Sequence, residues 1–238
     1  MPVLAESIPR RCDTRPMTRV IAGQAGGRRL AVPPGTTTRP TSDRAREGLF
    51  ASLLSELGTF DGARVLDLYA GSGAIGLEAL SRGAGRVLLV ESDARAAAVI
   101  KANVKAVDLP GATVAIDRVE RLLARPPAGG QNHDHDHDHD DDRDHDQDQD
   151  RFDLVIADPP YALADDAVAR VLTLLQGGWL ADGALVVIER ATRSGPVDWT
   201  PGFLPGKSRR YGEATFWYGW YGGEAGAGQT GTASRSEA

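Results

Sequence analysis

Residues 67–83 read Asp-Leu-Tyr-Ala-Gly-Ser-Gly-Ala-Ile-Gly-Leu-Glu-Ala-Leu-Ser-Arg-Gly. The glycines of this stretch satisfy G-x-G-x-x-G, an apolar run precedes them and a helix-like run follows, and Glu91 ends the next apolar run. This order is typical of a strand, a tight turn and a helix that together bind a nucleotide. It predicts a site for an adenine nucleoside, and the glycines alone leave NAD open.

Apolar runs and amphipathic helices alternate on both sides of this stretch. Such alternation predicts a mainly parallel α/β sheet with helices on both faces. The last apolar segment, 208–221, has no helix between its halves, so we expect an antiparallel hairpin at the sheet edge. The expected strands cover 63–70, 85–92, 112–116, 152–157 and 183–190, and the expected helices cover 42–57, 71–83 after its turn, 93–107, 119–124 and 163–176.

Two short strands, Thr18–Gly23 and Arg28–Val32, flank a glycine-rich turn and predict an N-terminal hairpin. The helix from Ser42 carries an apolar stripe. The stripe consists of Ala45, Leu49, Phe50, Leu53, Leu54 and Leu57. We divide the chain into a disordered arm (1–17), a basic hairpin extension (18–41), the main domain (42–221) with a disordered His/Asp-rich insertion (126–150), and a disordered tail (222–238).

The 18 residues of 133–150 hold ten Asp, one Arg and all five His. Their negative charge masks the positive net charge of the rest of the chain. The whole chain has a formal net charge of −6, but without this tract 26 basic residues face 23 acidic ones, a net charge of +3. The first 50 residues carry nine Arg and four acidic residues. A basic body indicates an anionic partner such as nucleic acid.

The tract alternates two metal-binding residue types, but a repeat without fixed geometry does not make a structural metal site. It precedes the fourth main strand, so we expect it at the amino ends of the strands, as a solvated insertion away from the ligand edge. We therefore predict no metal site. One cysteine and no long apolar run exclude a disulfide framework and a membrane span, and favour the cytoplasm.

Asp67 moves the prediction from NAD toward S-adenosylmethionine. A carboxylate four residues before Gly71 would repel a pyrophosphate, whereas it can hold the ammonium group of a methionine moiety. An oxidoreductase remains the alternative, although the chain shows no obvious substrate domain.

Asp158-Pro159-Pro160-Tyr161 follows the apolar strand of 152–157 and therefore lies at its carboxyl end. Parallel sheets bind ligands along that edge. An amine conjugated to a ring is a poor nucleophile, and two acceptors, the Asp158 carboxylate and the Pro159 carbonyl, could grip its N–H groups. Asp158 could then take the proton. Tyr161 offers a stacking surface for an extruded base.

With the N-terminal segments 19–30 and 38–50, these motifs resemble the RsmD-type family of 16S rRNA guanine-N2 methyltransferases. The resemblance covers about 18–221 except the tract. It implies a Rossmann-like class I methyltransferase fold, S-adenosylmethionine as donor, and a guanine N2 amine of 16S rRNA, guanine 966, on an assembled or assembling 30S subunit. Relatives start near 18, so we expect 1–16 to be dispensable or to reflect an upstream start, and a monomer is the default.

The resemblance also assigns residues. It places the cofactor against Asp67, Tyr69, Ala70, Gly71, Ser72, Gly73, Glu91 and Ser92, with Glu91 on the ribose. Many relatives have another pattern near the adenine, where this chain has Asp117 and Arg118. It assigns the guanine to Asp158, Pro159, Pro160 and Tyr161, and the basic N-terminal block would bring Arg19, Arg28, Arg29 and Arg39 to RNA phosphates beside the active-site edge.

Other functions remain open at this point. They are methylation of an amine in DNA, in another RNA or in a protein amide, NAD-dependent oxidoreduction, and a non-catalytic role in RNA binding and assembly.

Overall fold

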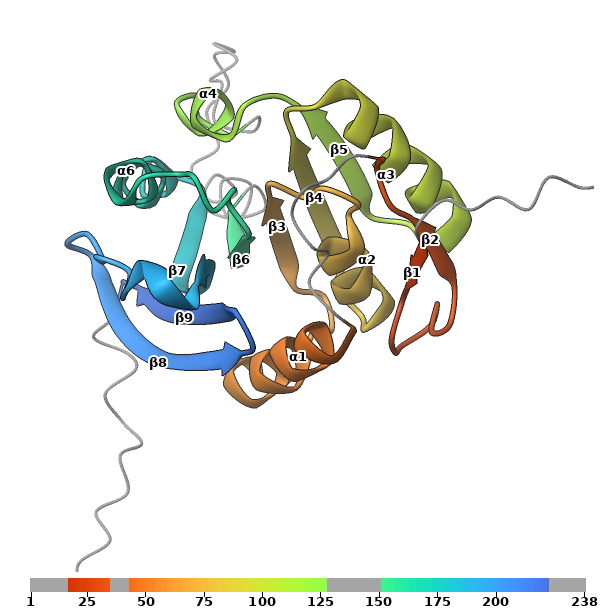
Figure 1. The fold of residues 1–238 in the computed structure, drawn as a ribbon, viewed down its shortest axis with the longest axis horizontal. Coiled ribbons are helices and arrows are strands. Elements are labelled where there is room, and N and C mark those ends of the chain that lie inside the picture. Colours follow the sequence, from red (N-terminus) through yellow and green to blue (C-terminus); the bar gives the residue numbers. More distant parts are fainter. Residues whose placement is uncertain (1–16, 35–42, 128–150, 223–238) are drawn as a thin grey trace, which may run out of the picture.

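Seven strands form one sheet in the order β5-β4-β3-β6-β7-β9-β8 in the computed structural model (Figure 1). The structure describes residues 17–34, 43–127 and 151–222. The strands are β3 (Arg64–Leu68), β4 (Arg86–Glu91), β5 (Ala112–Ile116), β6 (Phe152–Ala157), β7 (Leu180–Ala191), β8 (Phe203–Tyr211) and β9 (Ala214–Tyr221).

The strands pair as the sequence pattern predicts. β3 lies between β4 and β6 and is parallel to both, and β5 and β7 extend the parallel part. β9 pairs antiparallel with β7, and β8 pairs antiparallel with β9 at the edge. The α/β fold with an antiparallel C-terminal edge hairpin is therefore confirmed. β7 begins three residues before its predicted start, because Leu180 already pairs with Phe152 across an irregularity in the ladder.

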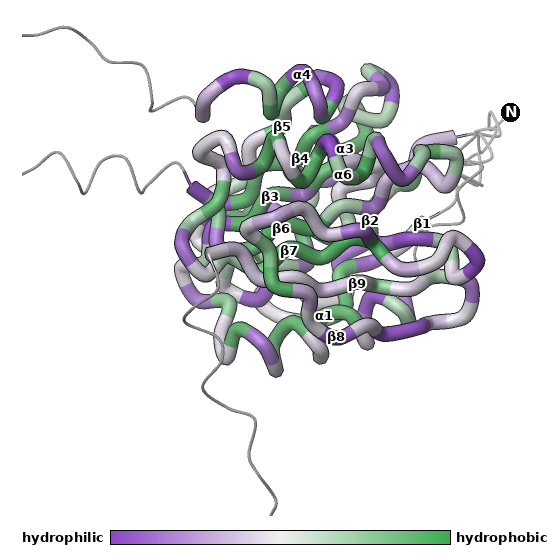
Figure 2. Tube along the Cα trace, turned by 90° about the vertical axis from the view of Figure 1, so that its left-hand side faces the viewer, coloured by the Kyte–Doolittle hydropathy of each residue, from purple (hydrophilic) through white to green (hydrophobic). Residues whose placement is uncertain are grey.

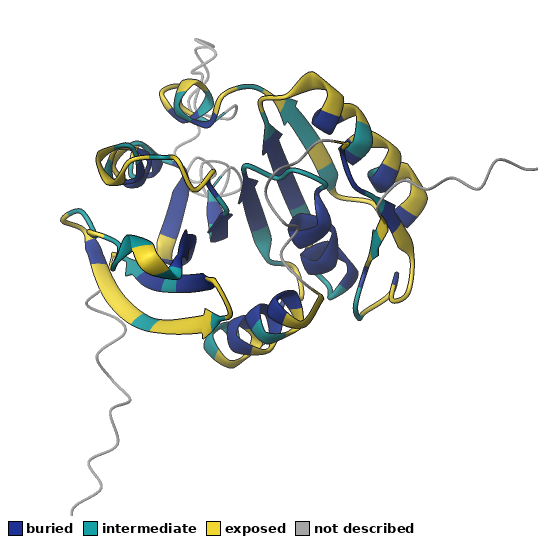
Figure 3. Cartoon of the chain, in the orientation of Figure 1, coloured by how far each residue is buried: buried dark blue, intermediate teal, exposed yellow. Residues whose placement is uncertain are grey.

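Helices cover both faces of the sheet, because the central parallel strands are apolar on both sides. On one face α1 (Asp43–Leu57), α2 (Ala74–Ser81) and α3 (Ala94–Val107) pack against the sheet. On the other face lie α4 (Val119–Leu123) and α6 (Asp165–Leu175). Figure 2 shows hydrophobic residues concentrated in the central strands, and Figure 3 shows that β6 and β7 are buried whereas β8 is largely exposed.

The N-terminal hairpin of β1 (Met17–Arg19) and β2 (Arg29–Ala31) is confirmed as a separate antiparallel pair. It packs through Val20, Ala25 and Leu30 on a small core shared with α2 and α3. β1 ends earlier than predicted, because the N–H groups of Ile21 and Ala22 bond to the Glu78 carboxylate of α2 instead of to β2.

Helix α1 follows the predicted apolar stripe, with one exception. Leu49, Phe50 and Leu53 are fully buried, whereas Leu54 is 44% exposed. The prediction that Leu54 is buried was wrong. The buried face of a helix holds only three to four residues per two turns, and the buried Arg46 occupies one of these positions.

Three predicted segments fall in whole or in large part outside the described residues. They are the arm before Met17, the tail after Gly222 and the insertion from 128 to 150. Within the parts that the structure describes, no helix is long and apolar enough to cross a membrane.

Candidate cofactor and substrate site

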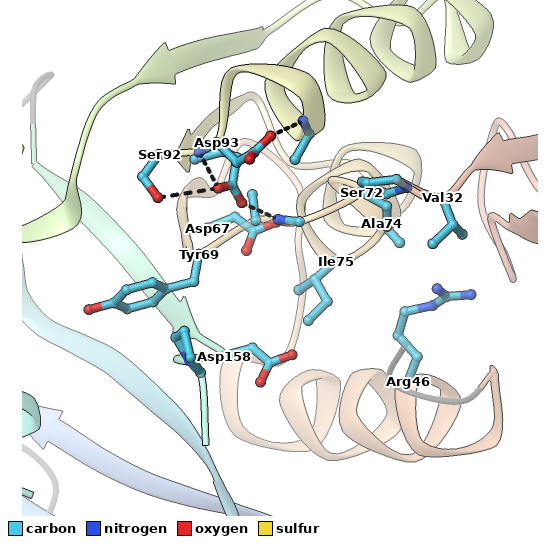
Figure 4. A pocket seen from close by; sticks show the side chains of 16 residues that line it. Val32, Arg46, Asp67, Tyr69, Ser72, Ala74, Ile75, Ser92, Asp93 and Asp158 are labelled. Carbon is cyan, nitrogen blue, oxygen red and sulfur yellow. Dashed lines mark hydrogen bonds between the residues drawn. The ribbon is translucent and has the colours of Figure 1, made fainter. Parts of the chain in front are cut away.

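A cavity of about 300 Å³ opens at the carboxyl ends of β3, β4 and β6 (Figure 4). Strand order places it where ligands bind in open α/β sheets, beside the point at which the chain reverses direction across the sheet. The residues that line it include Asp67, Tyr69, Ala70, Gly71, Ser72, Glu91, Ser92, Asp158 and Pro160. The structure thus brings both sequence motifs to one cavity.

The glycine loop turns sharply from β3 into α2. Tyr69, Gly71 and Gly73 have φ values of 61°, 57° and 75°, in the left-handed region that favours glycine. A Cβ atom on Gly76 would lie 2.8 Å from a Val87 methyl carbon and 3.0 Å from the Asp67 carboxylate. The turn therefore favours glycine at positions 71 and 73 because of their backbone conformation. At position 76 glycine is required for a different reason, because α2 packs closely on the sheet there.

Asp67 is 2% exposed and lies at the base of the cavity. Its Oδ2 accepts a hydrogen bond of 2.9 Å from the Gly76 N–H. The pKa of Asp67 is raised to about 7, chiefly by burial; the Gly76 hydrogen bond opposes this shift, and the charges of Asp158 and Glu91 add to it. A cationic ligand group at this point would stabilise the ionised carboxylate and so offset the free-energy cost of its burial.

Glu91 ends β4 and organises the opposite side of the cavity. Its carboxylate accepts hydrogen bonds from the Gly71 N–H (2.9 Å) and the Asp93 N–H (2.8 Å). Asp93 also lines the cavity, and its side chain caps α3 by accepting from the N–H groups of Arg95 and Ala96. Those two bonds lower the pKa of Asp93. Asp93 was not among the predicted site residues, although an Asp directly before a helical run is a recognisable cap.

Asp117 and Arg118 lie next to the end of β4, but neither lines the cavity. The Asp117 carboxylate pairs with Arg121 and Arg125, and the hydrogen bond from Arg121 is the largest influence that lowers its pKa. The Asp117 carboxylate is thus engaged by its own helix α4.

The Asp158–Tyr161 segment follows β6 directly. Asp158 and Pro160 line the cavity, Pro159 is buried, and Tyr161 is 39% exposed. Partial burial raises the pKa of the Tyr161 phenol, and the charges of Glu189 and Asp158 raise it further. The segment thus places a carboxylate in the cavity and carries an exposed aromatic residue directly after the cavity-lining Pro160.

Arg190, which the sequence analysis missed, holds the chain after Tyr161. It is 5% exposed near the end of β7, and its guanidinium donates to the Leu163 carbonyl (2.9 Å) and to the Asp165 carboxylate (2.6 Å). The sequence offered little reason to predict a buried role for Arg190, because an Arg at the end of an apolar strand usually marks the start of a loop. Topology gives it a partner by placing β7 beside β6.

Arg46 was also missed, and it is the one cationic side chain among the described residues that line the cavity. It is 1% exposed, and its guanidinium donates to the Arg19 carbonyl (2.7 Å), Thr18 Oγ1 (3.1 Å) and Asp43 Oδ1 (3.0 Å). Burial lowers its pKa, against the attraction of Asp43. Spacing of three, four and seven residues from Arg46 to Leu49, Phe50 and Leu53 could have predicted that it faces inward.

Figure 4 shows how these groups are distributed along the cavity. Ser92 and Asp93 lie at one end, Arg46 lies at the other, and Asp67 and Asp158 lie between them. Polar groups are therefore spaced along the cavity among apolar residues such as Val32 and Ile75, with its cationic side chain at the end formed by α1 and the hairpin.

The three described arginines that were predicted to contact RNA lie along the hairpin. Arg19 is exposed and pairs with Asp43 at 3.4 Å, and Arg29, its partner in the ladder, is exposed. Arg28 donates to the Ala106 carbonyl near the end of α3. None of the three lines the cavity, and Arg39 is outside the described residues.

Comparisons with known proteins agree with this geometry. The family described as Conserved hypothetical protein 95 matches residues 18–220. Ribosomal RNA small subunit methyltransferase D of Escherichia coli K12 is 33% identical over 187 residues, which are 76% of this chain and 81% of that protein. The solved structure of a hypothetical protein of Thermus thermophilus, TTHA0928, is 31% identical, with a TM-score of 0.61 over 84% of this chain and 98% of that one.

A more distant solved structure shares the fold. It is magnesium protoporphyrin IX methyltransferase from Synechocystis PCC 6803 with bound S-adenosylmethionine, 13% identical with a TM-score of 0.53, covering 75% of this chain and 78% of that one. The fold is thus that of the class I methyltransferases. By the family match and the identity to the E. coli protein, the chain belongs to the RsmD-type methyltransferases.

Proposed function

We propose that this protein transfers a methyl group from S-adenosylmethionine to the N2 amine of a guanine in 16S rRNA, guanine 966 by family resemblance. The observation that carries the proposal is the meeting of two sites at one sheet edge. The glycine loop with Asp67 and Glu91 and the Asp158–Tyr161 segment open into the same cavity. The substrate is an assembled or assembling 30S subunit, and the enzyme acts as a monomer.

The residues of the cavity fit this cofactor. The glycine loop leaves room for a ligand against the backbone, and a carboxylate near each of its ends, Asp67 and Glu91, matches an ammonium group and ribose hydroxyls. Arg46, at the end of the cavity away from Ser92 and Asp93, provides the positive charge that a methionine carboxylate requires. S-Adenosylmethionine supplies an electrophilic methyl group on a sulfonium sulfur.

The charge of the cavity supports the choice of this cofactor over NAD. Asp67 and Asp158 place carboxylates on the side of the cavity where a pyrophosphate would need N–H groups or cations. An adenine nucleoside without phosphate avoids that repulsion.

The chain's own part in the reaction falls to the segment after β6. The Asp158 carboxylate and the Pro159 carbonyl accept the two N–H groups of the guanine amine, which orients its nitrogen lone pair toward the methyl group. Two successive prolines fix φ and offer no N–H donors, so the acceptors stay in place. Asp158 then takes the proton that methylation makes acidic, a general-base role worth on the order of 10²–10⁴ in rate.

Tyr161 holds the guanine ring. It follows Pro160, which lines the cavity, and its 39% exposure leaves an aromatic surface on which an extruded base can stack. Stacking on an aromatic side chain stabilises a bound base by about 1–3 kcal/mol.

The test uses the full-length protein, labelled S-adenosylmethionine and 30S subunits from cells that lack the gene. Label should enter one guanine of 16S rRNA as an N2-methyl group, and Asp158→Asn should lower the rate by at least about 10² with unchanged cofactor affinity. Free 16S rRNA, DNA and a protein extract serve as alternative substrates. Labelling of one of these instead of the subunit would overturn the proposal.

A further inference from the structure

Two exposed arginines lie on elements toward the β8 edge of the sheet, beyond the strand that leads to Tyr161 as seen from the cofactor strands. Arg193 belongs to η2 (Thr192–Ser194), which begins directly after β7, and Arg210 lies near the end of β8. In the sheet order, β6 with its Asp158–Tyr161 segment stands between the cofactor strands and these two elements. A nucleic-acid strand that enters the site from this side would therefore pass both arginines before it reaches Tyr161.

The ladder places Arg210 on the same face as the loop of Tyr161. Arg210 pairs with Thr215 of β9, and Thr215 pairs with Arg190 of β7. Directly paired residues share a face, so Arg210 and Arg190 point to the same side, about 10 Å apart across two strand spacings. Arg190 bonds to Leu163, two residues after Tyr161. Arg210 thus lies within reach of a nucleotide next to one held by Tyr161.

η2 is fixed to the β8–β9 turn, so the two arginines belong to one surface. The Thr192 N–H donates to the Glu213 carbonyl at 2.7 Å, and the hydroxyls of Thr192 and Thr215 lie 3.0 Å apart. We call Arg193 and Arg210 the arginine rim. Among the described residues neither forms an ion pair, and Arg210 uses only its Nε, toward the Gly212 carbonyl at 3.1 Å.

The rim is also electrostatically close to Tyr161. The charges that act on the Tyr161 phenol include Arg193, which lowers its pKa, and Glu213, which raises it. Glu213 is exposed at the tip of the β8–β9 turn and is the acidic neighbour that an approaching phosphate would meet.

Arg28 of the hairpin lies elsewhere. Arg28 is bonded to Ala106, at the end of α3 opposite to Asp93, which lines the cavity. A helix of 14 residues is about 20 Å long, so Arg28 lies at roughly that distance from the reaction edge.

We propose that the arginine rim binds the RNA phosphates next to the target guanine, so that the substrate strand crosses the end of β7 and the β8–β9 turn. This inference rests on the proposed function. Exposed guanidinium groups match phosphate in charge and in paired N–H geometry. Contacts to phosphate set the position of the strand without reading its sequence.

The experiment compares two variants that each remove two exposed positive charges: Arg193→Gln with Arg210→Gln, and the control Lys101→Gln with Lys105→Gln on α3. Wild-type and variant proteins methylate 30S subunits from cells that lack the gene. The rim variant should raise KM for subunits about tenfold, with kcat within about a factor of two and unchanged affinity for S-adenosylmethionine. The slope of log Kd against log salt should fall by about 1.4 for two lost contacts to a single strand.

Two further variants separate charge from shape. Replacement of both rim arginines by Lys should restore most of the affinity, and Glu213→Gln should tighten subunit binding. A control variant that loses as much affinity as the rim variant, or a rim variant that matches wild type, would overturn the rim assignment. If wild-type enzyme transfers no methyl group to the subunit, the proposed function itself fails.

Discussion

The Asp67 carboxylate accepts a 2.9 Å hydrogen bond from the Gly76 N–H, and this bond joins the end of β3 to the first turn of α2. The same bond holds a buried acid at the base of the cavity, where burial raises its pKa to about 7. The Asp67–Gly76 hydrogen bond therefore both fixes α2 against β3 and holds in place the carboxyl group that a cofactor would contact.

We predict that cofactor affinity depends on pH through Asp67. Below pH 7 the carboxyl is protonated and attracts an ammonium group less, so the Kd for S-adenosylmethionine should rise about tenfold per pH unit between pH 7 and pH 5. Calorimetric titration across this range measures it. Asp67→Asn should bind weakly at every pH, and a variant that kept the wild-type pH dependence would contradict the assignment.

The same group makes a prediction about stability. The folded protein binds a proton at Asp67 more tightly than the unfolded chain does, so between about pH 4 and pH 7 this group lowers the free energy of unfolding as the pH rises. Urea unfolding at several pH values, compared with Asp67→Asn, isolates its contribution. The variant should lose this part of the pH dependence while other carboxyls keep theirs.

Glu78 should prove essential for the N-terminal hairpin. It is fully buried in α2, where it accepts from the N–H groups of Ile21 (2.6 Å) and Ala22 (3.0 Å) and from Arg82. Glu78→Ala leaves these donors without a partner and should cost about 2–4 kcal/mol of unfolding free energy. Urea unfolding measures it. Glu47→Ala, an exposed change in α1, is the control and should cost less than about 0.5 kcal/mol.

Arg190 should act as a positioning residue for the Asp158–Tyr161 segment. Arg190→Gln loses the ion pair with Asp165 and should lower kcat about tenfold, because the segment that holds the substrate is less well fixed. Steady-state kinetics should show unchanged affinity for S-adenosylmethionine, and Arg190→Lys should recover part of kcat. Asp165→Asn is the matched change on the other partner. An equal loss of cofactor affinity would indicate a general structural defect instead.

Deletion of residues 131–150 should leave turnover nearly intact. The segments that flank the insertion support this, because Pro127 lies near Gly178 before β7, and Arg151 directly precedes β6. Both are at the amino ends of the strands, across the sheet from the cavity. Methylation kinetics with and without added Zn²⁺ measure the effect, and a large loss on deletion would show that the tract takes part in the reaction.

The amino-acid sequence was enough to predict the alternation of strands and helices, the glycine turn and the edge hairpin. These features depend on local pattern: apolar period, positive φ at glycines, and the lack of a helix between the last two strands. It also determined that Asp67, Glu91 and Asp158 share an edge, since each ends a strand of a parallel sheet. Leu54 shows the limit of local pattern, because only packing decides which residues at the border of a stripe are covered.

The positions of the arginines, by contrast, depend on contacts between segments that are distant in the sequence. Arg46 and Arg190 look solvated in the sequence, yet both are buried: Arg46 donates to the Arg19 carbonyl, the Thr18 hydroxyl and the Asp43 carboxylate, and Arg190 donates to the Leu163 carbonyl and the Asp165 carboxylate. The exposed arginines look alike in the sequence, yet the hairpin directs Arg28 to the far end of α3, and the β7–β9–β8 ladder brings Arg210 toward Tyr161. Composition fixes how much charge a chain carries, but strand order and register decide where that charge lies.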